Sequence, residues 1–120
     1  VDDSPSQLMS IRRIVEKLGH DALTAEDGAA GVEAAKREIP DLILMDVVMP
    51  NLNGFQATRS ITRDPSTRHI PVILVTTKDQ DTDRVWGMRQ GAKAYITKPF
   101  NESDLSDIIA QYLGGSPGAA

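Results

Sequence analysis

Three short, mostly apolar runs in this chain each lead directly into a polar side chain that can contact a phosphate group. The runs and the residues that follow them are 42–45 with Asp46, 72–75 with Thr76, and 94–97 with Lys98. Apolar runs of this length are typical of buried parallel strands, whose carboxyl ends meet at one edge of a sheet. The sequence therefore predicts a single crevice that holds a carboxylate, a hydroxyl and an ammonium group.

Helical patterns alternate with these runs. Apolar residues recur at helical spacing within 5–18, 28–39, 55–62, 79–90 and 101–113, and a further strand candidate covers 20–25. This alternation predicts an α/β fold with helices on both faces of a parallel sheet. We expect the flavodoxin-like, doubly wound arrangement of five strands in the order 2-1-3-4-5. Because only Val1 precedes the acidic pair Asp2-Asp3, we expect the first strand to be truncated in this chain.

Composition narrows the class of protein. The length of 120 residues suits one domain with a buried core. We expect that domain to cover 1–113, with a flexible tail over 114–120 and residues missing upstream of Val1. The net charge of −4 gives no support for a nucleic-acid partner. The sequence has no cysteine and no apolar stretch near the roughly 20 residues that span a bilayer. We therefore expect a cytoplasmic protein without a membrane partner.

The acidic residues of the crevice suit a hard cation. If Asp2, Asp3 and Asp46 converge to about 4 Å, each pair repels by roughly 4 kcal/mol at an effective dielectric constant near 20. A divalent cation removes this penalty, and carboxylates with a backbone carbonyl suit Mg²⁺. Asp46 can accept a phosphoryl group as a labile acyl phosphate. Taken alone, the Asp2-Asp3 pair could equally be the charged start of a helix.

The other polar residues carry weaker signals when each is taken alone. Lys98 supplies a compact positive charge, and Pro99 after it is a candidate for a cis peptide bond that aims the side chain. The Thr76 hydroxyl could bond to a phosphoryl oxygen, although it could also be an ordinary strand residue. Tyr95 could simply pack in the core. Trp86 lies on a largely polar helix, which is typical of either core packing or a partner surface.

Together these residues resemble a response-regulator receiver domain of the CheY-like kind. The matching positions are Asp2, Asp3, Asp46, Met49-Pro50, Gly54, Thr76, Tyr95 and Lys98-Pro99. The resemblance covers 1–113. Residues 45–59 and 75–80 are more similar still to the PilH-type regulators of type IV pilus twitching motility. Thr77 departs from the family, which usually has Ala or Gly there, so access to the phosphate would be tighter.

The resemblance implies a phosphorylatable signalling switch of a two-component system. A CheA-like histidine kinase would phosphorylate Asp46, and Mg²⁺ would be framed by Asp2, Asp3, Asp46 and the Val48 carbonyl. Such a protein is not an enzyme beyond assisting its own phosphoryl transfer and dephosphorylation. The closer similarity implies a stand-alone regulator of twitching motility or a chemotaxis-like pathway.

The resemblance also implies a route for the signal. Thr76 and Lys98 would hold the phosphoryl group. Thr76 and Tyr95 would relay the change to a downstream protein partner, which would contact the helix over 79–90, the strand that carries Tyr95 and the last helix.

Other functions remain open. The chain could be a receiver that drains phosphoryl groups from a shared kinase, a receiver fragment of a larger regulator, or a degenerate receiver. A haloacid-dehalogenase-type phosphohydrolase would need a second Asp at the position of Val48. A flavodoxin-like electron carrier would need a Ser-, Thr- and Gly-rich phosphate loop where this chain has Asp2 and Asp3.

Overall fold

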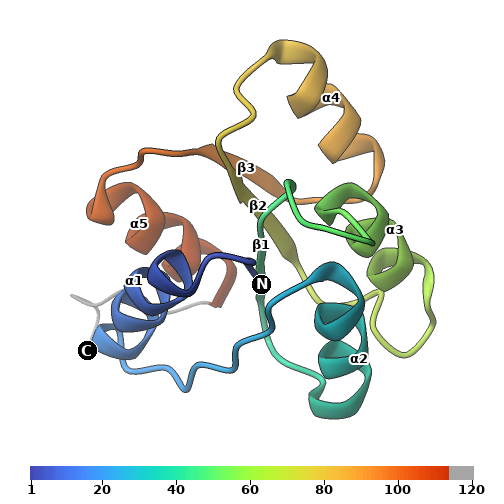
Figure 1. Cartoon of the computed structure of the whole chain (residues 1–120). Coiled ribbons are helices and arrows are strands. Elements are labelled where there is room, and N and C mark those ends of the chain that lie inside the picture. The colour runs from blue at the N-terminus through green and yellow to red at the C-terminus, as the bar shows by residue number, and fades with distance from the viewer. Residues whose placement is uncertain (114–120) are drawn as a thin grey trace.

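The computed structural model describes residues 1–113, and in it helices and strands alternate from α2 onward (Figure 1). The elements are α1 (Pro5–Lys17), α2 (Gly28–Glu38), β1 (Ile43–Met45), α3 (Gly54–Arg63), β2 (Val72–Thr76), α4 (Asp81–Arg89), β3 (Ala94–Thr97) and α5 (Glu102–Leu113). The predicted tail over 114–120 lies outside the described residues. No helix within 1–113 is both long enough and apolar enough to cross a membrane.

The described sheet is parallel and has the order β1-β2-β3. Its side chains alternate between two faces, so β2 divides the core into two clusters. Val72 and Leu74 pack with residues of α2 and α3, whereas Ile73 and Val75 pack with residues of α1 and α5. All five residues of β2 are buried because helices cover both faces. The predicted α/β fold with a parallel sheet between helices is confirmed.

Two of the five expected strands are not formed within residues 1–113. Val1 lies between β1 and the segment 20–25: its amino nitrogen donates to the Leu44 carbonyl at 2.6 Å, and its carbonyl accepts from the Asp46 N–H at 2.9 Å. On the other side, the Asp2 N–H donates to the Ala25 carbonyl at 3.1 Å. These bonds place Val1 and Asp2 where the order 2-1-3 puts the first strand.

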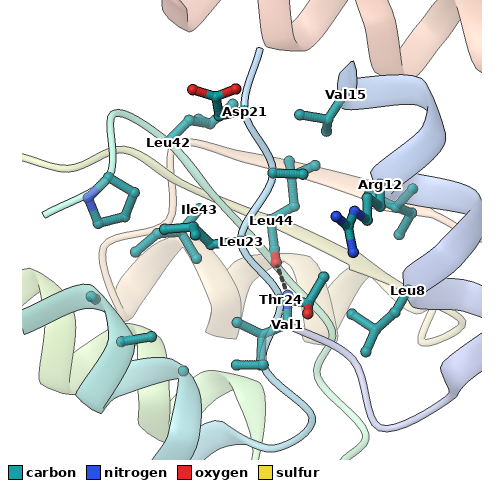
Figure 2. A pocket seen from close by; sticks show the side chains of 17 residues that line it. Val1, Leu8, Arg12, Val15, Asp21, Leu23, Thr24, Leu42, Ile43 and Leu44 are labelled. Atoms are coloured by element: carbon teal, nitrogen blue, oxygen red, sulfur yellow. Dashed lines mark hydrogen bonds between the residues drawn. The ribbon is translucent and has the colours of Figure 1, made fainter. Parts of the chain in front are cut away.

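The prediction of a strand over 20–25 was therefore wrong. The segment has no regular strand structure, and its apolar residue Leu23 is 63% exposed. The physical reason is the short partner, because two residues offer too few backbone groups to pair a neighbouring strand. A pocket of about 150 Å³, lined by residues of α1, α2, β1 and 21–25, lies beside Val1 (Figure 2).

Candidate functional site

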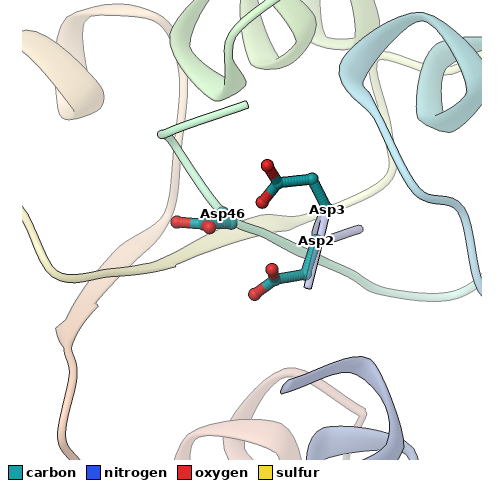
Figure 3. A group of neighbouring side chains, drawn as sticks. All are labelled: Asp2, Asp3 and Asp46. Atoms are coloured by element: carbon teal, nitrogen blue, oxygen red, sulfur yellow. The ribbon is translucent and has the colours of Figure 1, made fainter. Parts of the chain in front are cut away.

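Three carboxyl groups converge at the carboxyl end of β1. The side chains of Asp2, Asp3 and Asp46 each offer an oxygen, and these oxygens lie within 4.8 Å of one another (Figure 3). Asp2 is 2% exposed and Asp46 is 8% exposed, whereas Asp3 is open to solvent. The structure thus brings together the three acidic residues that the sequence singled out.

The backbone explains why Asp2 is fixed here. Backbone hydrogen bonds hold Val1 and Asp2 between β1 on one side and Ala25 on the other. The Asp2 carboxylate then accepts the Ser4 N–H at 2.9 Å, which ties it to the start of α1. Its position therefore follows from the local fold of residues 1–5 and not from the acidic cluster itself.

Asp46 is fixed by the tight turn into α3. A Cβ on Gly54 would lie 2.0 Å from the Asp46 carbonyl oxygen, so only a glycine permits this approach. Asn53 and Gln56 form a reciprocal capping box: the Gln56 N–H donates to the Asn53 side chain at 2.9 Å, and the Asn53 N–H donates to the Gln56 side chain at 3.0 Å. The N-x-x-Q spacing was a visible capping signal that the sequence analysis missed.

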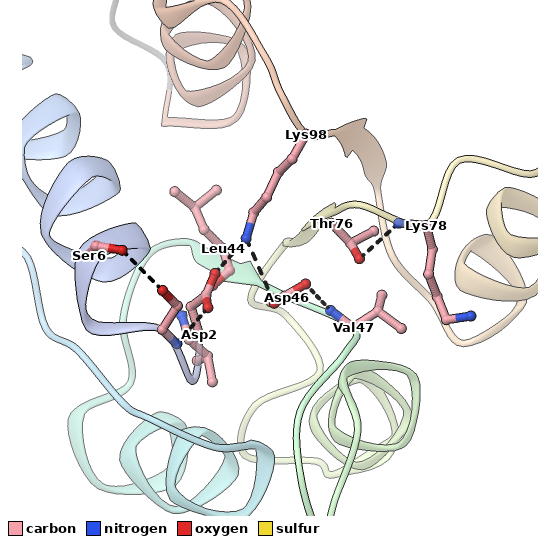
Figure 4. A network of polar contacts seen from close by, with 10 residues as sticks. Asp2, Ser6, Leu44, Asp46, Val47, Thr76, Lys78 and Lys98 are labelled. Carbon is pink, nitrogen blue, oxygen red and sulfur yellow. Dashed lines mark hydrogen bonds and ion pairs between the residues drawn. The ribbon is translucent and has the colours of Figure 1, made fainter.

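Lys98 enters the same site from the end of β3. Its ammonium nitrogen lies 2.6 Å from Asp2 Oδ2 and 3.7 Å from Asp46 Oδ2, and the side chain is 10% exposed (Figure 4). The Lys98 N–H donates to the Thr76 carbonyl at 2.7 Å, which links β3 to the end of β2. The peptide bond between Lys98 and Pro99 is cis. One largely buried ammonium group therefore lies beside two of the three carboxyl groups.

Burial and the neighbouring charges shift the pKa of the Asp46 carboxyl. Burial raises the pKa of the Asp46 carboxyl above its usual range; Lys98 opposes the shift and Asp2 adds to it. Asp46 Oδ1 accepts the Val47 N–H at 2.7 Å. The donor set consists of oxygens only, and one ammonium does not balance it. Both features fit a hard divalent cation such as Mg²⁺, which favours the charged form of each carboxyl.

Thr76 and Tyr95 are joined through a single residue between them. Thr76 is fully buried, and its hydroxyl oxygen accepts the Lys78 N–H at 3.3 Å. The Tyr95 hydroxyl donates to the Lys78 carbonyl at 2.8 Å. Burial and the nearby Asp83 raise the pKa of Tyr95 to about 12, so it stays a hydrogen-bond donor at neutral pH. The two predicted switch residues are thus connected by the backbone of Lys78.

Two of the remaining predicted residues lie at the border of the site. The Val48 side chain is about half exposed, and Thr77, which follows Thr76, is also exposed.

The helix expected to meet a partner, α4, presents Val85, Trp86 and Met88, each about half exposed. A residue that the sequence analysis did not single out, Arg84, has its guanidinium carbon 5.3 Å from the centroid of the Tyr95 ring.

Comparisons with known proteins identify the family that the chain matches. The family model described as "Response regulator receiver domain" matches residues 1–110. The chain is 56% identical over 115 residues to Protein PilH of Pseudomonas aeruginosa, covering 96% of this chain and 95% of that protein. It is 38% identical over 102 residues to Response regulator PleD of Caulobacter vibrioides, covering 85% of this chain but only 22% of that protein.

A solved structure is similar over nearly the whole chain. It is the receiver domain of a sensor histidine kinase from Pseudomonas aeruginosa, with a magnesium ion coordinated in its active-site cleft. The two share 32% sequence identity with a TM-score of 0.87, and the match covers 96% of this chain and 94% of that one. The fold predicted from the sequence is therefore that of known receiver domains.

Proposed function

This chain belongs to the response regulator receiver family of two-component systems, and we propose that it is a switch whose phosphoryl group is carried by Asp46. The observation that carries the proposal is the setting of that carboxylate. Asp46 is nearly buried at the carboxyl end of β1, with an ammonium group 3.7 Å away and two further carboxyl groups beside it.

Phosphoryl transfer to Asp46 forms an acyl phosphate. A carboxylate oxygen attacks the phosphorus of a donor phosphohistidine, and the P–N bond breaks. Its electron pair stays on the imidazole nitrogen, which then takes up a proton. Asp2, Asp3, Asp46 and the Val48 carbonyl would hold Mg²⁺, which when bound supplies positive charge to the carboxylates and the phosphoryl oxygens.

Two residues of the chain are placed to hold the new phosphoryl group. Lys98 is a compact cation, and it lies on the side of Asp46 that carries Oδ2. The Thr76 hydroxyl accepts a hydrogen bond from Lys78, which leaves its own hydrogen available to donate to a phosphoryl oxygen. Both contacts are stronger with a doubly charged group than with the carboxylate alone.

The donor that we propose is a CheA-like histidine kinase in the cytoplasm. A carboxylate that is 8% exposed can be reached only if the donor protein contacts the border of the site. A groove of about 650 Å³ between α1 and residues 98–100 opens beside Lys98, and its lining includes Ile14, Lys17 and Phe100. Its mixed apolar and charged lining suits contact with another protein domain.

The output that we propose is control of type IV pilus twitching motility. The 56% identity to PilH over 95% of that protein supports this assignment. The downstream partner would meet α4, β3 and α5, where Val85, Trp86 and Met88 form an exposed apolar surface. The alternative of a receiver within a larger regulator is supported by the PleD match, which uses only 22% of that protein.

A small-molecule phosphodonor tests the proposed function. Wild-type chain incubated with acetyl phosphate and Mg²⁺ should gain one phosphoryl group by intact-mass measurement, and omission of Mg²⁺ should lower the yield. Asp46→Asn should gain none. Asp41→Asn, an exposed residue just before β1, is the matched control and should behave as wild type. Equal uptake by Asp46→Asn and wild type would overturn the proposal.

A further inference from the structure

Two contacts hold the Tyr95 side chain, one to Lys78 just before α4 and one to Arg84 within α4, and a third contact holds its backbone. Its hydroxyl donates to the Lys78 carbonyl at 2.8 Å. Its ring lies under the Arg84 guanidinium, with 5.3 Å between the guanidinium carbon and the ring centroid. Arg84 also approaches the Tyr95 carbonyl, with Nη1 at 3.5 Å. Tyr95 is therefore held at its hydroxyl, at one face of its ring and at its backbone carbonyl.

Gly87 permits the close approach of α4 to this ring. A Cβ at position 87 would lie 2.6 Å from Leu74 Cδ1 and 3.2 Å from Tyr95 Cδ2 and Cε2. Gly87 is also the only buried residue of α4 in the structure as described for 1–113. Since α4 buries so little of itself, the stacking of Arg84 on Tyr95 is one of the few contacts that join the helix to β3.

The same tyrosine is linked to the phosphorylation site through Lys78. The Lys78 N–H donates to the Thr76 hydroxyl, and the Lys78 carbonyl accepts from the Tyr95 hydroxyl. If the Thr76 side chain moves so that its hydroxyl reaches a phosphoryl oxygen, the 3.3 Å hydrogen bond from the Lys78 N–H lengthens and the peptide is free to move. The anchor of the Tyr95 hydroxyl then moves with it.

We propose that Arg84 is a positioning residue that holds Tyr95 in this orientation and thereby opposes phosphorylation of Asp46. The proposal rests on the function proposed above. Phosphorylation that displaces Tyr95 must break the stacking contact, so Arg84 stabilises the unphosphorylated state. By linkage, the loss of Arg84 strengthens the binding of a phosphoryl group or its mimic by the factor with which Arg84 favours the unphosphorylated state. Cation–π contacts at exposed sites correspond to about a two- to five-fold effect.

Three variants isolate the contribution of Arg84. Arg84→Met keeps the length of the side chain and removes the cation, whereas Arg84→Lys keeps the charge. Arg89→Met removes another exposed arginine from the same helix and serves as the control. Beryllofluoride with Mg²⁺, titrated by calorimetry, should bind Arg84→Met about two- to five-fold more tightly than wild type. Arg84→Lys should lie near wild type, and Arg89→Met should equal it.

A second readout needs no ligand. In wild-type chain, NMR should show cross-relaxation between the Tyr95 ring protons and the Gly87 α-protons, and this signal should weaken in Arg84→Met but not in Arg89→Met. Unchanged cross-relaxation together with unchanged or weaker beryllofluoride binding by Arg84→Met would overturn the role of Arg84. If wild type itself binds no beryllofluoride, the proposed function fails, and the cross-relaxation alone decides whether Arg84 positions Tyr95.

Discussion

The buried ammonium of Lys98 is paired with Asp2, at 2.6 Å, more closely than with Asp46, at 3.7 Å. Asp2 is also one of the three carboxyl groups that converge on the candidate metal position. A cation at that position therefore competes with Lys98 for Asp2. If a metal ion occupied Asp2, Lys98 would be free to contact Asp46 and a phosphoryl group on it.

This competition predicts the effect of removing the lysine on metal affinity. Lys98→Met should bind Mg²⁺ more tightly than wild type, on the order of tenfold, because one positive charge near the metal position is lost. The same variant should be phosphorylated more slowly. Calorimetric Mg²⁺ titration provides the measurement, with Asp3→Ala as the opposite control, which should bind more weakly. Weaker binding by Lys98→Met would contradict the competition.

The raised pKa of Asp46 predicts how stability depends on pH. A folded-state pKa above the unfolded-state value gives stability that is complete below the unfolded-state pKa and is lost as pH rises through the folded-state pKa. At pH 7 without divalent cations, Asp46→Asn should therefore melt at a higher temperature than wild type. The shift should be roughly 2–8 °C for each kcal/mol gained.

The gain should shrink as the pH falls, since the wild-type carboxyl becomes protonated and neutral. Scanning calorimetry from about pH 4, near the ordinary pKa of an Asp side chain, to about pH 7 tests this trend. Asp41→Asn, at an exposed position outside the acidic cluster, serves as the control. An Asp46→Asn variant that is less stable than wild type at neutral pH would show that burial of this charge does not oppose folding.

The sequence predicted the fold wherever the residues of a strand alone are enough to identify it. Three strands can be identified from their own apolar residues, namely the runs before Asp46, Thr76 and Lys98. The carboxyl ends of parallel strands then meet at one edge of the sheet. Segment 20–25 was not predictable in this way, because its pairing depends on how much of the neighbouring strand is present. Leu23 is consequently exposed.

The site was predictable in residue type but not in its supporting contacts. Acidic residues at strand ends indicated the cluster, whereas the stacking of Arg84 on Tyr95 depends on how α4 packs against β3. The approach of Gly54 to the backbone of Asp46 likewise depends on the shape of the turn between them, which the residue types alone do not predict. The weakly patterned α4 gave no signal of which of its faces meets the sheet.

The close approach at Gly54 predicts a costly substitution. Gly54→Ala places a Cβ against the Asp46 carbonyl oxygen, so the backbone must shift. We expect a loss of about 1–3 kcal/mol in the free energy of unfolding, measured by urea denaturation, together with weaker Mg²⁺ binding. Ser60→Ala, on an exposed position of the same helix, should change either quantity little. Wild-type stability of Gly54→Ala would mean that the turn adapts without strain.

The Lys78 bridge predicts where a bound phosphoryl mimic is felt. Beryllofluoride with Mg²⁺ should shift NMR resonances over 76–98, including Tyr95 and Trp86, far more than those of residues 32–37 in α2. The reason is that α4 has few buried contacts and is therefore the helix most easily displaced. Shifts confined to residues that touch the mimic would instead indicate a receiver that only drains phosphoryl groups.

The most direct test of the account locates the acyl phosphate on the chain. Borohydride reduces an aspartyl phosphate to homoserine, which tandem mass spectrometry can place at a single position. After reaction of wild-type chain with acetyl phosphate and Mg²⁺, followed by reduction, homoserine should appear at position 46 and at no other aspartate. Homoserine at position 2 or 3, or phosphorylated chain without homoserine at position 46, would contradict the assignment of Asp46 as the phosphoacceptor.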